Sequence, residues 1–124
     1  MNEEAVDGPF AFTVDFASTD TSEGDAVAQG IYVLVGMYVT NIGRTSQTYL
    51  AAYQRLLDSA GREYSPDIRA TMRLTNGAGP LEINPGNRPL VGLLFDVPKG
   101  TRPSQYLLLL HASPDSPGVT VSLK

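Results

Sequence analysis

The 124-residue sequence contains no cysteine and only one histidine, His111. Without cysteine the chain forms neither a disulfide framework nor a thiolate nucleophile or thiolate metal site. A single histidine excludes a metal site built from several imidazoles. No Gly-x-Ser-x-Gly pattern supplies a nucleophile for His111 to activate, so we interpret it as a side chain at a strand edge. No catalytic set is recognisable, and we expect no enzyme and no cofactor.

Long apolar runs are missing as well. No stretch approaches the roughly 20 consecutive apolar residues that a membrane-spanning helix needs. The first seven residues, Met-Asn-Glu-Glu-Ala-Val-Asp, lack the basic and apolar regions of a secretory leader. We therefore expect one folded domain that does not itself contact a membrane.

Basic residues are absent from the first 43 positions, which carry seven acidic residues. The net charge is −4 and the pI is about 4.7. Because no basic stripe with interleaved aromatic residues is present, nucleic acid is not an expected partner. Residues 1–8 are predicted to form an acidic, solvated arm, and residues 9–124 the folded domain.

The clearest secondary-structure signal runs from Gly30 to Asn41 and contains no charged residue. Its valine, isoleucine and tyrosine side chains favour an extended, pleated backbone, and we predict a central strand. One face would carry Ile31, Val33, Val35, Met37 and Val39. The opposite face would carry Tyr32, Leu34, Gly36, Tyr38 and Thr40.

Further short strands are separated by glycine, proline and asparagine turn signals. They are expected at Pro9–Phe16, Pro89–Val97, Gln105–His111 and Val119–Leu123. No spacing typical of a β-α-β unit occurs, so the pattern predicts an all-β, antiparallel sandwich. A polar loop is expected over residues 17–28, and residues 67–75 are expected to be strand or irregular.

The segment from Gln47 to Ala60 gives conflicting signals. Its apolar residues have helical spacing, which favours a short amphipathic helix. The following residues, Leu56 to Tyr64, are typical of a strand, a tight turn and a second strand. Residue patterns alone leave both alternatives open.

Three acidic residues of the expected polar loop, Asp20, Glu23 and Asp25, are the candidate metal ligands. Calcium takes six or more oxygen ligands, and these residues lack the spacing of the twelve-residue calcium loop. A solvated loop is the favoured interpretation.

Five short motifs in this order make a fairly specific combination. They are Asp7-Gly8-Pro9-Phe10, the Gly30 strand ending at Asn41-Ile42-Gly43, the segment Leu56–Tyr64, Asn84-Pro85-Gly86 and the segment Leu94–Gly100. This combination resembles a domain of unknown function that is common in exported and lipid-anchored proteins of Gram-positive bacteria. That family is catalogued under a telomeric-repeat-binding name and is similar in fold to the mycobacterial immunoprotective extracellular protein.

The resemblance implies an immunoglobulin-like β-sandwich at the cell surface or outside the cell, in a secreted protein or lipoprotein. It also implies that Gln47 to Tyr64 forms strand, turn and strand rather than helix. The family brings no established catalytic residues. We therefore expect a non-enzymatic extracellular or cell-envelope module of uncharacterised function, with a protein–protein interaction or an accessory or spacer role. The alternative is an envelope module that binds a small ligand or calcium at residues 20–25.

A sandwich has one interior, so apolar side chains on both faces of the central strand leave one set facing outward. We take Tyr32, Leu34 and Tyr38 as candidates for an interface, with an envelope or extracellular protein or with a second copy as a weak homodimer. The alternative is that residues 47–53 fold over this face and bury it.

Overall fold

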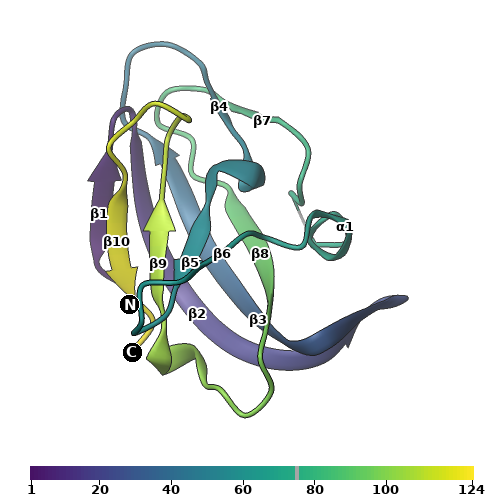
Figure 1. Ribbon diagram of the computed structural model, residues 1–124. Coiled ribbons are helices and arrows are strands. Elements are labelled where there is room, and N and C mark those ends of the chain that lie inside the picture. Colours follow the sequence, from purple (N-terminus) through teal and green to yellow (C-terminus); the bar gives the residue numbers. More distant parts are fainter. Residues whose placement is uncertain (75) are drawn as a thin grey trace.

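The computed structural model describes residues 1–74 and 76–124, and Figure 1 shows two antiparallel sheets packed against each other. One sheet has the strand order β1-β2-β3-β8 and the other β10-β9-β5-β6, while β4 and β7 form a separate pair. The strands are β1 (Glu4–Asp7), β2 (Phe10–Glu23), β3 (Ala26–Asn41), β4 (Gln47–Tyr49), β5 (Arg55–Leu57), β6 (Glu63–Tyr64), β7 (Leu81–Ile83), β8 (Leu90–Val97), β9 (Leu107–Leu110) and β10 (Val119–Ser122). The predicted all-β, immunoglobulin-like antiparallel sandwich is confirmed.

Strand β3 is the centre of its sheet, with β2 on one side and β8 on the other, as the sequence predicts. Its inward face supplies Val33, Val35, Met37 and Val39, all fully buried. These side chains belong to one core with leucines of the opposite sheet, among them Leu56, Leu108 and Leu110. Burying each such side chain contributes about 1.5–3 kcal/mol, so this layer dominates the stability of the fold.

The expected polar loop over residues 17–28 is wrong. Strand β2 continues to Glu23 and β3 begins at Ala26, so the two strands form a long hairpin that projects beyond the sandwich in Figure 1. Gly24 closes the hairpin with a positive φ of 59°. Serine, threonine and aspartate made the segment look like a loop, but pairing with β3 gives its backbone hydrogen-bond partners.

The N-terminal residues do not form a free arm as predicted for residues 1–8, because Glu4–Asp7 is a strand paired with the start of β2. Asp7 is buried, and its carboxylate accepts hydrogen bonds from the backbone amides of Ala112, at 2.7 Å, and Gly118, at 3.1 Å. This carboxylate ties the first strand to the loop between β9 and β10.

The two ends of the chain lie side by side in Figure 1. The amino group of Met1 is 3.5 Å from the carbonyl oxygen of Ser122, at the end of β10. Strands β1 and β10 are edge strands of different sheets, so this contact closes one side of the sandwich.

The disputed segment forms β4, a single 3-10 turn at Ala51–Tyr53, then β5 and β6. The strand, turn and strand implied by the family resemblance are therefore confirmed, and the helix favoured by periodicity is wrong. Tyr49 and Ala51 enter the core between the sheets, which accounts for the apolar spacing that imitates a helix.

A short helix, α1 (Ile68–Thr71), lies within the segment expected to be strand or irregular. Asp67 caps it by accepting a hydrogen bond from the amide of Ala70 at 3.1 Å. Residue 75, the last of that expected segment, lies outside the described residues. Helix α1 packs on the outer face of the β3 sheet, as Figure 1 shows, so the alternative in which residues 47–53 cover this face is wrong. Within the described ranges, no helix has the length and apolarity needed to cross a membrane.

Candidate functional site

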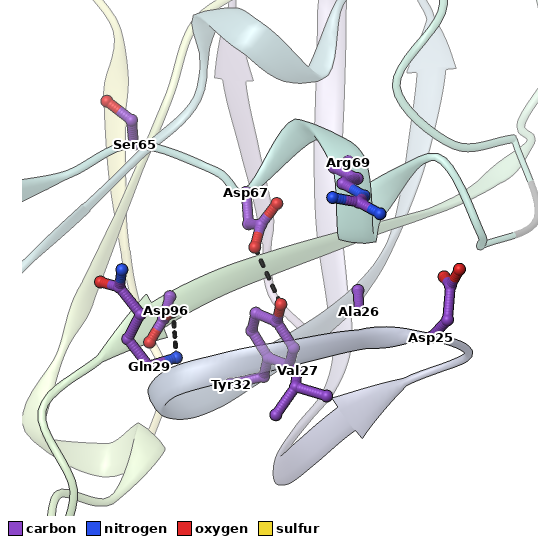
Figure 2. Close-up of a pocket in the computed structure, with 9 residues that line it drawn as sticks. All are labelled: Asp25, Ala26, Val27, Gln29, Tyr32, Ser65, Asp67, Arg69 and Asp96. Atoms are coloured by element: carbon purple, nitrogen blue, oxygen red, sulfur yellow. Dashed lines mark hydrogen bonds between the residues drawn. The ribbon is translucent and has the colours of Figure 1, made fainter.

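Two concave regions lie on the outer face of the β1-β2-β3-β8 sheet. The first, which we call the acidic hollow, has a volume of about 430 Å³ and lies between α1 and the projecting hairpin (Figure 2). It is lined by Asp25, Ala26, Val27, Gln29, Tyr32, Ser65, Asp67, Arg69 and Asp96. Three carboxylates and a phenol lie together in this hollow, as they would in a catalytic or metal site, and their hydrogen-bond and ion-pair partners decide what they do.

The Tyr32 side chain is 1% exposed, and its hydroxyl donates a 2.8 Å hydrogen bond to Asp67 Oδ2, drawn dashed in Figure 2. Burial, followed by the hydrogen bond to Asp67 and the charges of Asp67 and Asp96, raises the pKa of Tyr32 to about 12. The phenol therefore stays protonated at neutral pH. It acts as a donor that fastens α1 to the sheet.

Asp96, at the end of β8, accepts backbone amide hydrogen bonds from Gln29 at 2.7 Å and Gly30 at 2.9 Å. These amides lie where β3 departs from regular pairing with β2, so the carboxylate replaces a neighbouring strand as their acceptor. Gly30 has no room for a side chain, because a Cβ there would lie 1.9 Å from the carbonyl oxygen of Val97. The Asp96 carboxylate therefore has a structural role, because it holds the backbone of β3 at this irregular point.

Two of the three candidate metal ligands make other contacts. Asp20 Oδ1 accepts the amide of Thr21 at 2.7 Å, and Asp25 forms an ion pair with Arg73. Among the described residues, no three carboxylate or imidazole side chains are placed to share a metal ion. Asp20, Glu23 and Asp25 are therefore not brought together as the calcium site of the alternative interpretation.

The second region is an apolar groove of about 170 Å³, which we call the glycine groove. It is lined by Phe16, Leu34, Val35, Gly36, Leu74, Leu90, Val91 and Gly92. Gly36 and Gly92 are direct partners across β3 and β8. The Phe16 ring lies against Gly36 and the Leu74 side chain against Gly92, each within 3 Å of where a Cβ would be. The missing side chains leave a depression that these two apolar groups only partly fill.

The glycine groove remains open to solvent. Phe16 is 41% exposed and Leu90 is 37% exposed, on neighbouring parts of one sheet face. Exposed apolar groups that line a concavity are typical of binding surfaces, whereas scattered ones are ordinary. The groove is the strongest candidate for a functional site.

The three interface candidates have different outcomes. Tyr32 is sealed beneath α1, so its assignment to an interface is wrong. Leu34 lines the glycine groove, and Tyr38 is half-buried under the Arg88 guanidinium, 3.9 Å from the ring centre. Sequence reasoning missed Phe16, Gly36 and Gly92. Glycines inside two strong strand patterns were the available signal, because they mark places where another group approaches the backbone.

His111 follows β9, and its Nδ1 lies 3.1 Å from the carbonyl oxygen of Tyr53. The Gln54 side chain binds the His111 backbone twice, accepting its amide at 2.7 Å and donating to its carbonyl at 2.9 Å. These contacts fasten the 3-10 turn to the end of β9. They agree with a structural strand-edge residue.

Similar folds occur in two bacterial proteins of known structure. The yjhA protein from Bacillus subtilis is 21% identical, with a TM-score of 0.67, and the match covers 88% of this chain and 79% of that one. A conserved hypothetical protein from Bacillus anthracis is 10% identical, with a TM-score of 0.54, and the match covers 100% and 94% of the two chains. At these identities the likeness shows the fold alone.

No curated protein matches the sequence. A family sequence model does match, over residues 1–118, and its description is "Domain of unknown function (DUF4352)". That match spans all but the last six of the 124 residues. The chain therefore belongs to the DUF4352 domain family.

Proposed function

We propose that this domain is a non-enzymatic binding module of the cell envelope or extracellular space, and that it holds a partner protein at the glycine groove. The observation that carries the proposal is the exposure of Phe16 and Leu90 around an apolar depression on a rigid sheet. At about 170 Å³ the groove is smaller than the roughly 300–1,000 Å³ of small-molecule sites. Its size suits a single apolar side chain of a protein better than a whole cofactor.

The acidic hollow supports a non-enzymatic role. The carboxylates of Asp67 and Asp96 accept hydrogen bonds from the fold, and that of Asp25 pairs with Arg73. A general acid or base needs a carboxyl that is free to exchange a proton with substrate. The calcium-binding alternative has no comparable support, because its three candidates do not converge.

The location outside the membrane follows from the family resemblance described above and is part of the proposal. Expression of the natural gene in its own host, followed by separation of membrane, wall and medium, tests it. A domain found only in the cytoplasm would contradict this location.

Site-specific photocrosslinking tests the groove. A benzophenone amino acid at Leu90 should crosslink one discrete protein in the envelope fraction, and Phe16→Asp should abolish that product. Leu107 of β9 is the matched control, because it is a leucine with a similar exposure of 43% on the other sheet. Equal crosslinking from both positions, or none from Leu90, would overturn the assignment of the groove.

A further inference from the structure

Strand β2 has one edge that no other strand covers along most of its length. On one side it pairs with β3 from Phe10 to Glu23, but on the other it pairs with β1 only from Phe10 to Thr13. The Asn2 amide then bonds to the Val14 carbonyl at 2.7 Å, which ends this coverage. Within the described ranges, no strand pairs with the other side of residues 15–23, which we call the open edge.

The direction of the backbone groups follows from the register. The Val39 amide bonds to Pro89, so odd-numbered residues of β3 face β8 and even-numbered ones face β2. Gly36 and Leu34 therefore bond to β2, where their partners are Phe16 and Ser18. The residues that alternate with these, Ala17 and Thr19, direct their amides and carbonyls away from β3 and outward.

Irregularities in the β2–β3 register flank this stretch, at residue 15 and at residue 21. They limit the regular part of the open edge to Phe16–Asp20. Such interruptions are typical of edges that natural proteins keep from pairing indiscriminately. A short extended segment fits here, and a long flat strand does not.

Charge indicates the chemistry of that segment. Asp15, Asp20 and Glu23 lie along the open edge, and the first 43 residues contain no lysine or arginine. A second copy of the chain would bring two acidic edges together, and like charges opposite each other destabilise strand pairing. An extended segment with lysine or arginine at alternate positions gains both backbone hydrogen bonds and charge complementarity.

We propose that the open edge of β2 accepts a short, basic, extended segment of a partner protein as an added strand. This inference rests on the proposed binding function and names the chemistry of the partner. Phe16 connects the two surfaces, because its backbone belongs to β2 while its ring lies over Gly36 in the glycine groove.

The probe is the capped peptide of four Lys-Val repeats, titrated into ¹⁵N-labelled protein. The amide signals of Ala17 and Thr19 should shift and become protected from exchange. The matched control peptide carries N-methyl groups on alternate backbone amides, which keeps charge and side chains but removes the donors along one edge. Binding of this control should be at least tenfold weaker, and a peptide of Glu-Val repeats should not bind.

The variant Thr19→Pro removes an outward amide at an edge position where proline is tolerated, and should weaken binding at least tenfold. Thr19→Val is its control and should bind as wild type. If Thr19→Pro fails to fold, the N-methylated peptide gives the same comparison on the unmodified protein.

Two results would overturn the inference. Equal affinity of the N-methylated and plain peptides would show charge attraction without strand pairing. Shifts confined to Leu34, Leu74 and Leu90 would show groove binding alone, so the proposed function would stand while strand addition fails. Crosslinking from Leu90 reports on the groove independently of the peptide, which separates failure of the two proposals.

Discussion

Two buried tyrosines, Tyr49 and Tyr32, differ in whether the hydroxyl has a hydrogen-bond partner. The Tyr49 hydroxyl lies in the core and is the buried side-chain oxygen for which the described residues offer no hydrogen-bond partner. Burial raises the pKa of Tyr49 well above its usual value. The Tyr32 side chain is also only 1% exposed, but its hydroxyl borders the acidic hollow and donates to Asp67. A buried polar group without a partner costs about 1–3 kcal/mol, whereas a satisfied one contributes about 1 kcal/mol.

The variant Tyr49→Phe should therefore keep or raise the free energy of unfolding, by up to about 1 kcal/mol, because it removes an unsatisfied hydroxyl at constant shape. Tyr32→Phe should lower it by about 1 kcal/mol, because Asp67 loses a donor. Urea denaturation gives the free energy of unfolding of each variant, and the values can be compared if the m-values agree. A marked loss for Tyr49→Phe would mean that its hydroxyl finds a partner in solution.

The sequence placed Tyr32 correctly on the face opposite the core residues of β3. Periodicity gives the face of a side chain, but it cannot say whether a distant segment covers that face. The cover comes from two residues some forty positions later: Ala70, in a helix too short to show a helical period, and Leu74, just after that helix. The sequence does contain one sign of that helix, since aspartate at position 67 is a preferred N-cap residue.

At the scale of secondary-structure elements, glycine is required at two positions for different reasons. Gly61 closes the turn between β5 and β6 with φ of 80°, and a Cβ there would meet nothing within 4 Å. Gly30 has an ordinary φ but no space, since its Cβ would collide with the Val97 carbonyl. The cost of a side chain is conformational at the first position and steric at the second.

The variant Gly61→Val should destabilise the domain by about 1–3 kcal/mol, because a branched side chain at positive φ is strained. Gly61→Asn is the control and should cost less, since asparagine tolerates the left-handed region. Thermal melting of the pair decides the point. Equal and negligible losses would mean that the turn adopts another geometry.

Gly30→Ala should cost more than Gly36→Ala, although both add one methyl group to β3. At Gly30 the obstacle is backbone, and we expect a loss above about 2 kcal/mol. At Gly36 the obstacle is the half-exposed Phe16 ring, which can swing aside, so the loss should stay near 1 kcal/mol. Denaturant midpoints compare them, and the reverse order would show that Phe16 is held rigidly.

The sequence predicts the strands that have many apolar residues, but it does not predict the part of β2 that forms the open edge. The uncharged run of valine, isoleucine and tyrosine in β3 and the apolar residues of β8 were enough to predict both strands. The residues of β2 beyond Phe16 predict a loop, because serine, threonine and aspartate are typical of loops. Their extended form depends on pairing with β3 and not on their own side chains, and the candidate site on that edge was missed for the same reason.

At the scale of the whole molecule, the Asp7 side chain joins the first strand, β1, to the loop that precedes the last strand, β10. Burial alone would raise the pKa of this carboxyl, but the nearby Ser116 hydroxyl, the amides of Ala112 and Gly118 and the charge of His111 outweigh it, and the pKa lies below its usual value. A group whose pKa is lowered by folding stabilises the native state above its unfolded pKa of about 3.9. That stabilisation disappears as the pH falls through the native pKa.

Asp7→Asn should therefore reduce stability at pH 7 and flatten the decline in stability between about pH 5 and pH 2. Some decline should persist, because Asp58 also has a lowered pKa through its contacts with Arg62 and Tyr64. Melting temperatures across this range test the prediction. Parallel curves for variant and wild type would show that Asp7 does not carry the acid sensitivity.

The adjacency of Met1 and Ser122 makes the chain nearly a closed ring. A short flexible linker between Met1 and Lys124 would complete the ring, and the chain could then be opened elsewhere without loss of any strand. The exposed turn at Lys99–Gly100, where no atom crowds Gly100, is a suitable place for new ends. Such a circular permutant would begin between β8 and β9 and should still form both sheets. The order in which the strands are synthesised would then be shown not to determine the fold.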